Sequence, residues 1–470
     1  MKPLSVHEAA DAVRGRIIRE GSASVINGVS TDTRTIQPGN LFVALEGERF
    51  DGHDYLQQAA DKGAAAVLIH NLHKFLPEGV HTIVTGNTLA ALQDLAAWHL
   101  KSFSIPVIAV TGSTGKTTTK DMVANVLSRK YSVLKTQGNF NNEIGLPMTL
   151  FGLEAHHQIA VLEMGMSGFG EIRRLAAIAR PKAAIFTNIG VSHMEGLGSR
   201  DGIWKAKSEV LEGFHEGCTV ILNDDNDILH READRMKQDK VPYDVIRFGT
   251  GTRSDYRADD IQILGEGGIA YNLWVNGTCS PIRLHAPGRH NVYNSLAAIA
   301  AGRLFGMDMK DIQEGLLEYV SGSMRLHIFT VPGRVDCKVI DDAYNASPDS
   351  VHAALQILKD MEGSRKIAVL GDMLELGEYS RQAHKQTGRM AAECGVHVLL
   401  TRGQDSVWIG EGAVEAGMQA EAVFHSSDNR GVIHWLENNL QEGDRILVKG
   451  SRGMQMEEIV SYLNNGGNRS

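Results

Sequence analysis

The chain has 470 residues, of which 43% are hydrophobic and 22% charged, and its formal net charge is -9 at pH 7. This balance is ordinary for a folded globular protein, and the length gives room for about three domains. The negative charge argues against a nucleic-acid partner, because nucleic-acid phosphates bind basic surfaces. The four cysteines form no C-x-x-C pair, so we expect neither a zinc site nor a disulfide framework.

The apolar runs of the sequence predict neither export nor membrane insertion. The first residues, Met1–Glu8, lack the apolar core of a signal peptide, and no apolar run is long enough to cross a bilayer. We therefore expect a cytoplasmic protein with reduced thiols and no membrane span.

The first predicted domain, residues 1–102, is a small α/β unit. Apolar runs and helical spacing predict its short strands and helices, at 41–44, 66–69, 82–84, 54–62 and 88–100. Two further segments, 30–34 and 46–53, are rich in polar residues and glycine. Their composition fits ligand-binding loops and solvated turns equally well.

The second predicted domain, residues 103–320, begins with a strand, a glycine turn and a helix. The apolar run Val107–Thr111 leads into the turn Gly112–Gly115, and Lys116 and Thr117 open an amphipathic run. Backbone N–H groups of such a loop cradle phosphates, with the lysine at the β- and γ-phosphates and the hydroxyl on Mg²⁺. Only two residues separate the glycines, fewer than in the usual loop. A chance glycine turn is the alternative, but the flanking strand and helix favour a nucleoside-triphosphate site.

The rest of the second domain predicts a mainly parallel sheet. Four buried-looking strands alternate with helical segments, at 159–163, 183–187, 219–222 and 245–248. An irregular, antiparallel stretch is expected from about 255 to 286, and a helix rich in small residues begins at His290.

The third predicted domain, residues 321–470, alternates strands and helices again. Strands are expected at 338–340, 366–370, 397–400, 422–424 and 445–448, and helices at 349–361 and 380–393. This order predicts a Rossmann-like sheet without a dinucleotide fingerprint.

Several polar residues follow predicted strands, where ligands of doubly wound sheets bind. Glu163 ends an apolar strand and is placed either to bind Mg²⁺ or to cap the next helix. His193 follows the next strand, although a lone histidine is more often structural. The acid pair ending at Asp342 can face the nucleotide across the cleft between the second and third domains.

Three other residues have two interpretations each. Asn291 and Asn294 share a helix face and fit either base binding or helix capping, and Arg325 fits a phosphate or a linker. From spacing alone, Lys207 is predicted to lie on a solvated charged helix face.

Taken together, these residues resemble the Mur ligase family of ATP-dependent amide-forming enzymes of peptidoglycan precursor synthesis. The resemblance covers the whole chain, and T-G-x-x-G-K-T-[ST] is that family's short phosphate loop. Three stretches resemble the members that add D-alanyl-D-alanine to UDP-N-acetylmuramoyl-tripeptide: Gly138–Pro147, Asp342–Pro348 and Leu370–Gly377. Members that add the third amino acid carry D-Y-A-H-x-P at the second place and, in their diaminopimelate form, D-N-P-R later. Neither motif is present, and Asp428–Arg430 lacks the proline.

The resemblance implies a role for each matched residue. The ATP-binding set is Gly112, Ser113, Thr114, Gly115, Lys116, Thr117 and Thr118, with Asn291 or Asn294 at adenine, Arg325 at the γ-phosphate, and Asp342 and Tyr344 at the ribose and phosphate side. The ligands of two Mg²⁺ ions are Thr117, Glu163, His193 and Lys207, the lysine as a carbamate, which reverses the reading from spacing. Lys116, Lys207 and His193 are the implied catalytic residues. The substrate-binding set is Ser30, Thr31, Asp32, Thr33 and Arg34 for uridine diphosphate, and Asn139, Asn141 and Asn142 for the muramoyl-peptide.

The implied reaction runs through an acyl phosphate on the tripeptide, which the amine of D-alanyl-D-alanine then attacks. We expect a monomer. One alternative is folylpolyglutamate synthase, which shares two domains but has no separate uridine-diphosphate domain before the phosphate loop. The other is a nucleotide-switch or motor ATPase, which needs no small-molecule amine.

Overall fold

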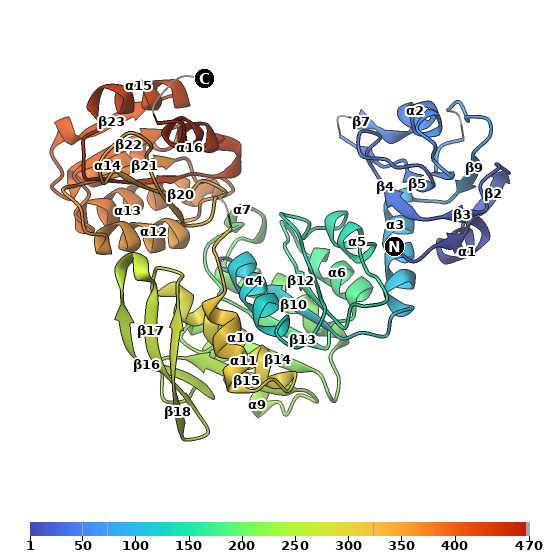
Figure 1. The fold of residues 1–470 in the computed structure, drawn as a ribbon, viewed down its shortest axis with the longest axis horizontal. Coiled ribbons are helices and arrows are strands. Elements are labelled where there is room, and N and C mark those ends of the chain that lie inside the picture. Colours follow the sequence, from blue (N-terminus) through green and yellow to red (C-terminus); the bar gives the residue numbers. More distant parts are fainter. Residues whose placement is uncertain (49, 73, 323, 467–470) are drawn as a thin grey trace.

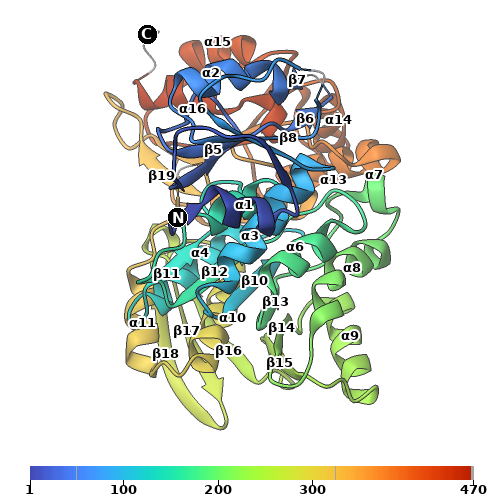
Figure 2. The same ribbon diagram turned by 90° about the vertical axis from the view of Figure 1, so that its right-hand side faces the viewer.

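The computed structural model describes residues 1–48, 50–72, 74–322 and 324–466. These residues form three larger sheets in chain order, each with helices packed against it (Figures 1 and 2). The predicted fold class, a three-part α/β protein with mainly parallel sheets, is confirmed. The exact divisions after residues 102 and 320 stay predictions. The described residues contain no helix long and apolar enough to cross a membrane.

The N-terminal sheet has five strands in the order β2-β9-β8-β5-β4, parallel except for β2. Strands β5 and β8 are buried along their whole length because both faces are covered. The segment predicted as a loop at 46–53 contains a short hairpin, β6–β7. The elements of this part are β1 (Leu4–Ser5), α1 (Val6–Ala12), β2 (Arg16–Arg19), β3 (Val25–Ile26), β4 (Gly28–Ser30), β5 (Asn40–Val43), β6 (Glu46–Gly47), β7 (Phe50–Asp51), α2 (Leu56–Asp61), β8 (Ala66–Ile69), β9 (His81–Val84) and α3 (Thr88–Lys101).

The central sheet has nine strands in the order β11-β12-β10-β13-β14-β15-β16-β17-β18. Its first part is parallel, and β16 to β18 form the antiparallel meander expected near 255–286. Alternate residues of β10 enter different cores: Val107 and Ala109 face one helical layer, and Ile108 and Val110 face the layer that contains α4 and α10. The elements are β10 (Val107–Thr111), α4 (Lys116–Leu127), β11 (Val133–Lys135), α5 (Gly145–Leu150), β12 (Ile159–Glu163), α6 (Glu171–Ala179), β13 (Ala183–Phe186), α7 (Met194–Leu197), α8 (Arg200–Ser208), β14 (Thr219–Asn223), α9 (Asp227–Gln238), β15 (Asp244–Gly249), β16 (Tyr256–Ile263), β17 (Ile269–Val275), β18 (Thr278–Leu284), α10 (His290–Leu304) and α11 (Met309–Leu317).

The C-terminal sheet has six strands in the order β19-β20-β24-β21-β22-β23, parallel except for the edge strand β19. Helices α12 to α14 cover one face, and α15 and α16 cover the other. The elements are β19 (His327–Thr330), β20 (Lys338–Asp342), α12 (Pro348–Asp360), β21 (Arg365–Gly371), η4 (Gly377–Tyr379), α13 (Ser380–Glu393), β22 (Val398–Arg402), α14 (Val407–Glu415), β23 (Val423–Ser426), α15 (Asn429–Asn439), β24 (Asp444–Lys449) and α16 (Glu457–Asn464).

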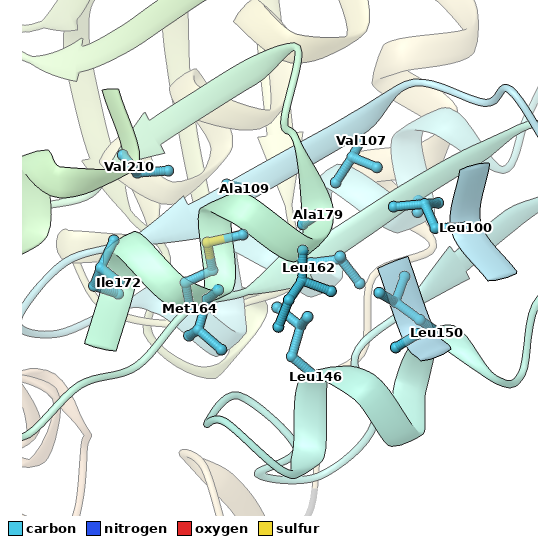
Figure 3. Close-up of a cluster of buried hydrophobic side chains, with 14 of the residues drawn as sticks. Leu100, Val107, Ala109, Leu146, Leu150, Leu162, Met164, Ile172, Ala179 and Val210 are labelled. Carbon is cyan, nitrogen blue, oxygen red and sulfur yellow. The ribbon is translucent and has the colours of Figure 1, made fainter. Parts of the chain in front are cut away.

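The N-terminal and central parts share a hydrophobic cluster through helix α3. Figure 3 shows Leu100 of α3 beside Leu150 of α5, next to Val107 and Leu162 of the central strands. Gln93 of α3 also donates a hydrogen bond to the Glu143 carbonyl at 3.2 Å. This continuous apolar packing fixes α3 against the central sheet.

Helices α13 and α14 approach so closely that glycine is needed on both. A Cβ on Gly388 would lie 1.9 Å from the Ile409 carbonyl oxygen, and one on Gly412 would lie 2.0 Å from the Lys385 carbonyl oxygen. We expect Gly388→Ala to lower the melting transition of the C-terminal part by roughly 5 °C, because overpacking outweighs the helix propensity of alanine. Scanning calorimetry tests this. Gly86→Ala, where a Cβ meets nothing within 4 Å, is the control and should leave all transitions in place; an unchanged Gly388→Ala transition would contradict the tight crossing.

Candidate active site

The phosphate loop Gly112–Gly115 lies between β10 and α4 and is held by the end of β13. Gly112 has φ +150° and Gly115 φ +77°, conformations that glycine adopts at no steric cost. A Cβ on Gly112 would lie 1.9 Å from the Thr187 hydroxyl. Asn188 accepts from the Thr114 N–H at 2.8 Å and donates to the Thr114 hydroxyl at 2.7 Å. The loop is therefore fixed in shape by residues far away in the sequence.

The Lys116 side chain folds back over the phosphate loop that precedes it. Its Nζ donates to the Gly112 carbonyl at 2.9 Å and to the Ser113 carbonyl at 3.4 Å. Burial lowers the pKa of Lys116, and the nearby Glu163 carboxylate partly opposes that shift. The cation thus lies at the loop itself, as the strand–loop–helix pattern predicted.

Glu163 ends β12 and is 2% exposed. Its Oε2 accepts from the Thr117 hydroxyl at 2.7 Å, and its Oε1 accepts from the Asn141 amide at 2.8 Å. The helix-capping alternative is not the arrangement found, because both oxygens bind side chains from other elements. A hydroxyl and a carboxylate side by side beside a phosphate loop are hard oxygen donors of the kind that Mg²⁺ prefers.

Lys207 lies on the buried face of α8 and is 0% exposed. Its Nζ has no hydrogen-bond partner in the part of the chain that the structure describes. Burial holds the pKa of Lys207 well below its usual value, with Lys116 lowering it further and Glu163 opposing. The reading from spacing, a solvated surface lysine, is wrong. A buried amine without a partner beside a carboxylate fits the carbamate that the resemblance implies.

His193 takes a left-handed conformation, φ +64°, just before α7. Its Nδ1 lies 2.6 Å from Glu375 Oε2, which comes from the C-terminal part. Among the described residues, no three His, Cys, Asp or Glu side chains come together as a metal site. A cation at Glu163 and Thr117 would therefore need further oxygen ligands, such as nucleotide phosphates and a lysine carbamate.

Asn291 and Asn294 are buried at the start of α10. Asn294 donates to Asn291 Oδ1 at 2.8 Å, Asn291 donates to the Pro287 carbonyl at 2.7 Å, and Thr119 of α4 donates to Asn294 Oδ1 at 3.0 Å. A Cβ on Gly115 would lie 2.9 Å from Asn294 Oδ1. In this structure the two asparagines connect helix α10 to helix α4, which follows the phosphate loop. A contact with adenine stays a prediction.

Of the two C-terminal residues Arg325 and Asp342, Arg325 acts on the phosphate loop through its charge, and Asp342 binds residues of its own part. The Arg325 guanidinium stacks on the Tyr344 ring, 4.1 Å from its centroid, and its charge contributes to lowering the pKa of Lys116. The Asp342 carboxylate accepts from Lys449 and from the Leu326 N–H. Arg325 is thus close enough to the phosphate loop to affect it electrostatically, as its predicted role at the γ-phosphate requires.

The predicted uridine-diphosphate segment forms a turn after β4 in the N-terminal part, across the central sheet from the C-terminal part (Figure 1). Ser30 donates to the Asp32 carbonyl at 2.9 Å, and Arg34 forms a forked pair with the Asp32 carboxylate while its side chain stays 86% exposed. Thr33 is buried and donates to Gln58 at 2.6 Å. Thr31 is partly exposed. Binding of uridine diphosphate here stays a prediction.

The three predicted muramoyl-peptide asparagines divide into two kinds. Asn139 is exposed, and Asn142 is exposed with its side chain accepting from the Ile144 and Gly145 N–H groups. Asn141 instead binds Glu163, so it belongs to the phosphate-loop site. Sequence reasoning missed Asn188, although its place directly after a buried strand was a usable signal. It also missed Glu375, which no pattern other than its motif singles out.

Comparison with known proteins places the chain in a family. It matches the family models described as Mur ligase family, catalytic domain (residues 25–99), Mur ligase middle domain (110–302) and Mur ligase, glutamate ligase domain (324–452). It is 41% identical to the UDP-N-acetylmuramoyl-tripeptide–D-alanyl-D-alanine ligase of Bacillus subtilis over 98% of both chains. The chain belongs to the Mur ligase family.

Solved structures of two MurF ligases share the whole fold. A crystal structure of MurF from Acinetobacter baumannii is 31% identical, covers 99% of both chains and superposes with a TM-score of 0.89. A crystal structure of MurF from Thermotoga maritima in complex with ADP is 27% identical, covers 93% of this chain and 97% of its own, and has a TM-score of 0.81.

Proposed function

We propose that this chain is an ATP-dependent ligase that joins D-alanyl-D-alanine to UDP-N-acetylmuramoyl-tripeptide in peptidoglycan precursor synthesis. The observation that carries the proposal is its similarity along the full chain, at 41% identity, to a ligase of that name. The similarity includes the N-terminal part, which argues against folylpolyglutamate synthase. Because the similar protein is a ligase, the same similarity also argues against a nucleotide-switch ATPase.

The phosphate loop and several residues around it bind ATP. Lys116 and the loop N–H groups face the β- and γ-phosphates, and Arg325 reaches the γ-phosphate from the C-terminal part, because it already acts electrostatically on Lys116. Asn291 or Asn294 contacts adenine, and Asp342 and Tyr344 lie at the ribose and phosphate side.

Two Mg²⁺ ions fit the donor set of Thr117, Glu163, His193 and a carbamate on Lys207. The adjacent oxygens of Thr117 and Glu163, 2.7 Å apart, and the unpartnered Nζ of Lys207 support this assignment. When bound, Mg²⁺ offsets the negative charge of the transferring phosphoryl group. Lys207 forms the carbamate as its free amine attacks CO₂ and releases a proton, which converts a buried neutral amine into an anionic oxygen ligand.

The reaction proceeds in two displacements on the substrates. The terminal carboxylate oxygen of the tripeptide attacks the γ-phosphorus, ADP leaves, and an acyl phosphate forms. The amine of D-alanyl-D-alanine then attacks the acyl carbon, the amide bond forms, and phosphate leaves. Asn139, Asn141 and Asn142 orient the muramoyl-peptide, and the turn Ser30–Arg34 binds its uridine diphosphate. Catalysis is then mainly orientation and electrostatic stabilisation by these fixed groups.

The substrates are a nucleotide sugar and ATP, so we place the enzyme in the cytoplasm. We also propose that it acts as a monomer.

Product analysis by mass spectrometry tests the function directly. With ATP, Mg²⁺, UDP-N-acetylmuramoyl-tripeptide and a panel of dipeptides, we expect a pentapeptide product only with D-alanyl-D-alanine-type dipeptides. Phosphate release should require all the substrates together. Release of phosphate from ATP alone at the same rate would favour a switch ATPase, and glutamylation of a folate would favour the other ligase.

A further inference from the structure

The motif Leu370–Gly377 has no role in the reaction described so far, yet the C-terminal part holds it firmly. It begins with the last two residues of β21, ends at the first residue of η4 and is followed by α13. The Asp372 carboxylate accepts from the Gln404 and Ser406 N–H groups at 2.9 and 2.7 Å. The Met373 N–H donates to His384, and the Leu374 N–H donates to Ser451. A loop fixed at three successive residues presents the next residue, Glu375, in a defined direction.

Glu375 meets His193 of the central part. The two side chains approach to 2.6 Å between Glu375 Oε2 and His193 Nδ1. Both residues have left-handed backbones, with φ +62° and φ +64°, which is uncommon for residues with a side chain. Beside them a Cβ on Gly377 would lie 3.3 Å from the Glu195 Cβ, and Figures 1 and 2 show α7 next to the C-terminal part. Two strained backbones thus meet at one contact between the parts.

We propose that Glu375 is a positioning residue that orients His193 as a cation ligand across the contact between the C-terminal and central parts. This inference rests on the proposed function. With Nδ1 facing the Glu375 carboxylate, Nε2 is the ring nitrogen left for a metal. Because the contact joins the two parts, it holds the His193 ring only while they lie against each other.

A purely structural role explains the contact less well. The Glu375 side chain is 60% exposed and that of His193 is 23% exposed. Exposed ion pairs contribute little to stability, whereas two left-handed side-chain-bearing residues cost free energy that the surroundings must offset. Orienting His193 as a metal ligand is a function that accounts for the cost of these two backbone conformations.

The test compares Glu375→Ala, Glu375→Gln and the control Glu378→Gln, an exposed acid three residues further on. With a non-hydrolysable ATP analogue and the tripeptide precursor bound, Mn²⁺ affinity is measured by electron paramagnetic resonance. We expect Glu375→Ala to weaken Mn²⁺ binding about tenfold, as loss of a partner of a ligating histidine does. Glu375→Gln, which still offers an acceptor oxygen, should recover part of that loss, and Glu378→Gln should bind like the wild type.

A double-mutant cycle separates positioning from structure. On a His193→Ala background, Glu375→Ala should cause no further loss of Mn²⁺ affinity, because the group it orients is gone. Melting temperatures should not differ among the Glu375 variants. Provided that the wild-type enzyme makes pentapeptide, either of two results would overturn the inference. One is wild-type Mn²⁺ affinity in Glu375→Ala, and the other is an equal loss of Mn²⁺ affinity from Glu375→Ala on both backgrounds. Absence of that product from the wild type would instead refute the proposed function.

Discussion

Lys116→Ala is expected to lower kcat by about three orders of magnitude while the protein stays folded. Among the residues that the structure describes, the Lys116 Nζ binds the Gly112 and Ser113 carbonyls of its own loop, so its removal breaks no contact between elements. The transferring phosphoryl group, however, loses the loop cation proposed to lie beside it. The measurement is phosphate release with all substrates present, together with the melting temperature.

Lys130→Ala is the matched control for this change. Lys130 follows the other end of the same helix, is exposed, and also donates to a backbone carbonyl, that of Gly306 at 2.9 Å. It should keep wild-type turnover. A kcat for Lys116→Ala within tenfold of the wild type would show that the loop does not bind the transferred phosphate.

The sheets were predictable because their strands are buried on both faces. Such strands are continuous apolar runs, and the runs at 107–111, 159–163 and 366–370 coincide with β10, β12 and β21 to within a residue or two. Short edge elements such as β1, β3 and β19 gave no such run, because partly exposed strands of two to four residues carry too few apolar positions.

The candidate site was predictable only where the motif is local. Gly112 to Thr117 form a loop and helix start whose geometry follows from consecutive residues. Spacing gave the wrong environment for Lys207, because burial depends on which face of α8 meets the sheet, and that face also buries Ile203 and Ala206. Contacts such as Asn141 with Glu163 and Glu375 with His193 join segments from different elements, so only the tertiary structure reveals them.

Lys207→Ala is expected to lower kcat by at least about a hundredfold, and acetate or formate should restore part of it. The Nζ is buried without a partner among the described residues, and its depressed pKa favours the free amine, the form that reacts with CO₂. Alanine removes the carbamate oxygens, and a small carboxylate can occupy the space left and supply oxygens of the same kind. Lys207→Arg should be as inactive as Lys207→Ala and insensitive to acetate, because it keeps a positive charge and fills the space.

Lys205→Ala is the control, because Lys205 lies on the exposed face of the same helix and should be dispensable. With ¹³C-labelled bicarbonate, a carbamate carbon signal should appear in the wild type and in Lys205→Ala and be missing from Lys207→Ala. This signal does not depend on turnover, so it separates the modification from any other cause of lost activity. Full activity in Lys207→Arg would show that the site requires no carbamate at this position, and a wild type without the carbon signal would show that none forms.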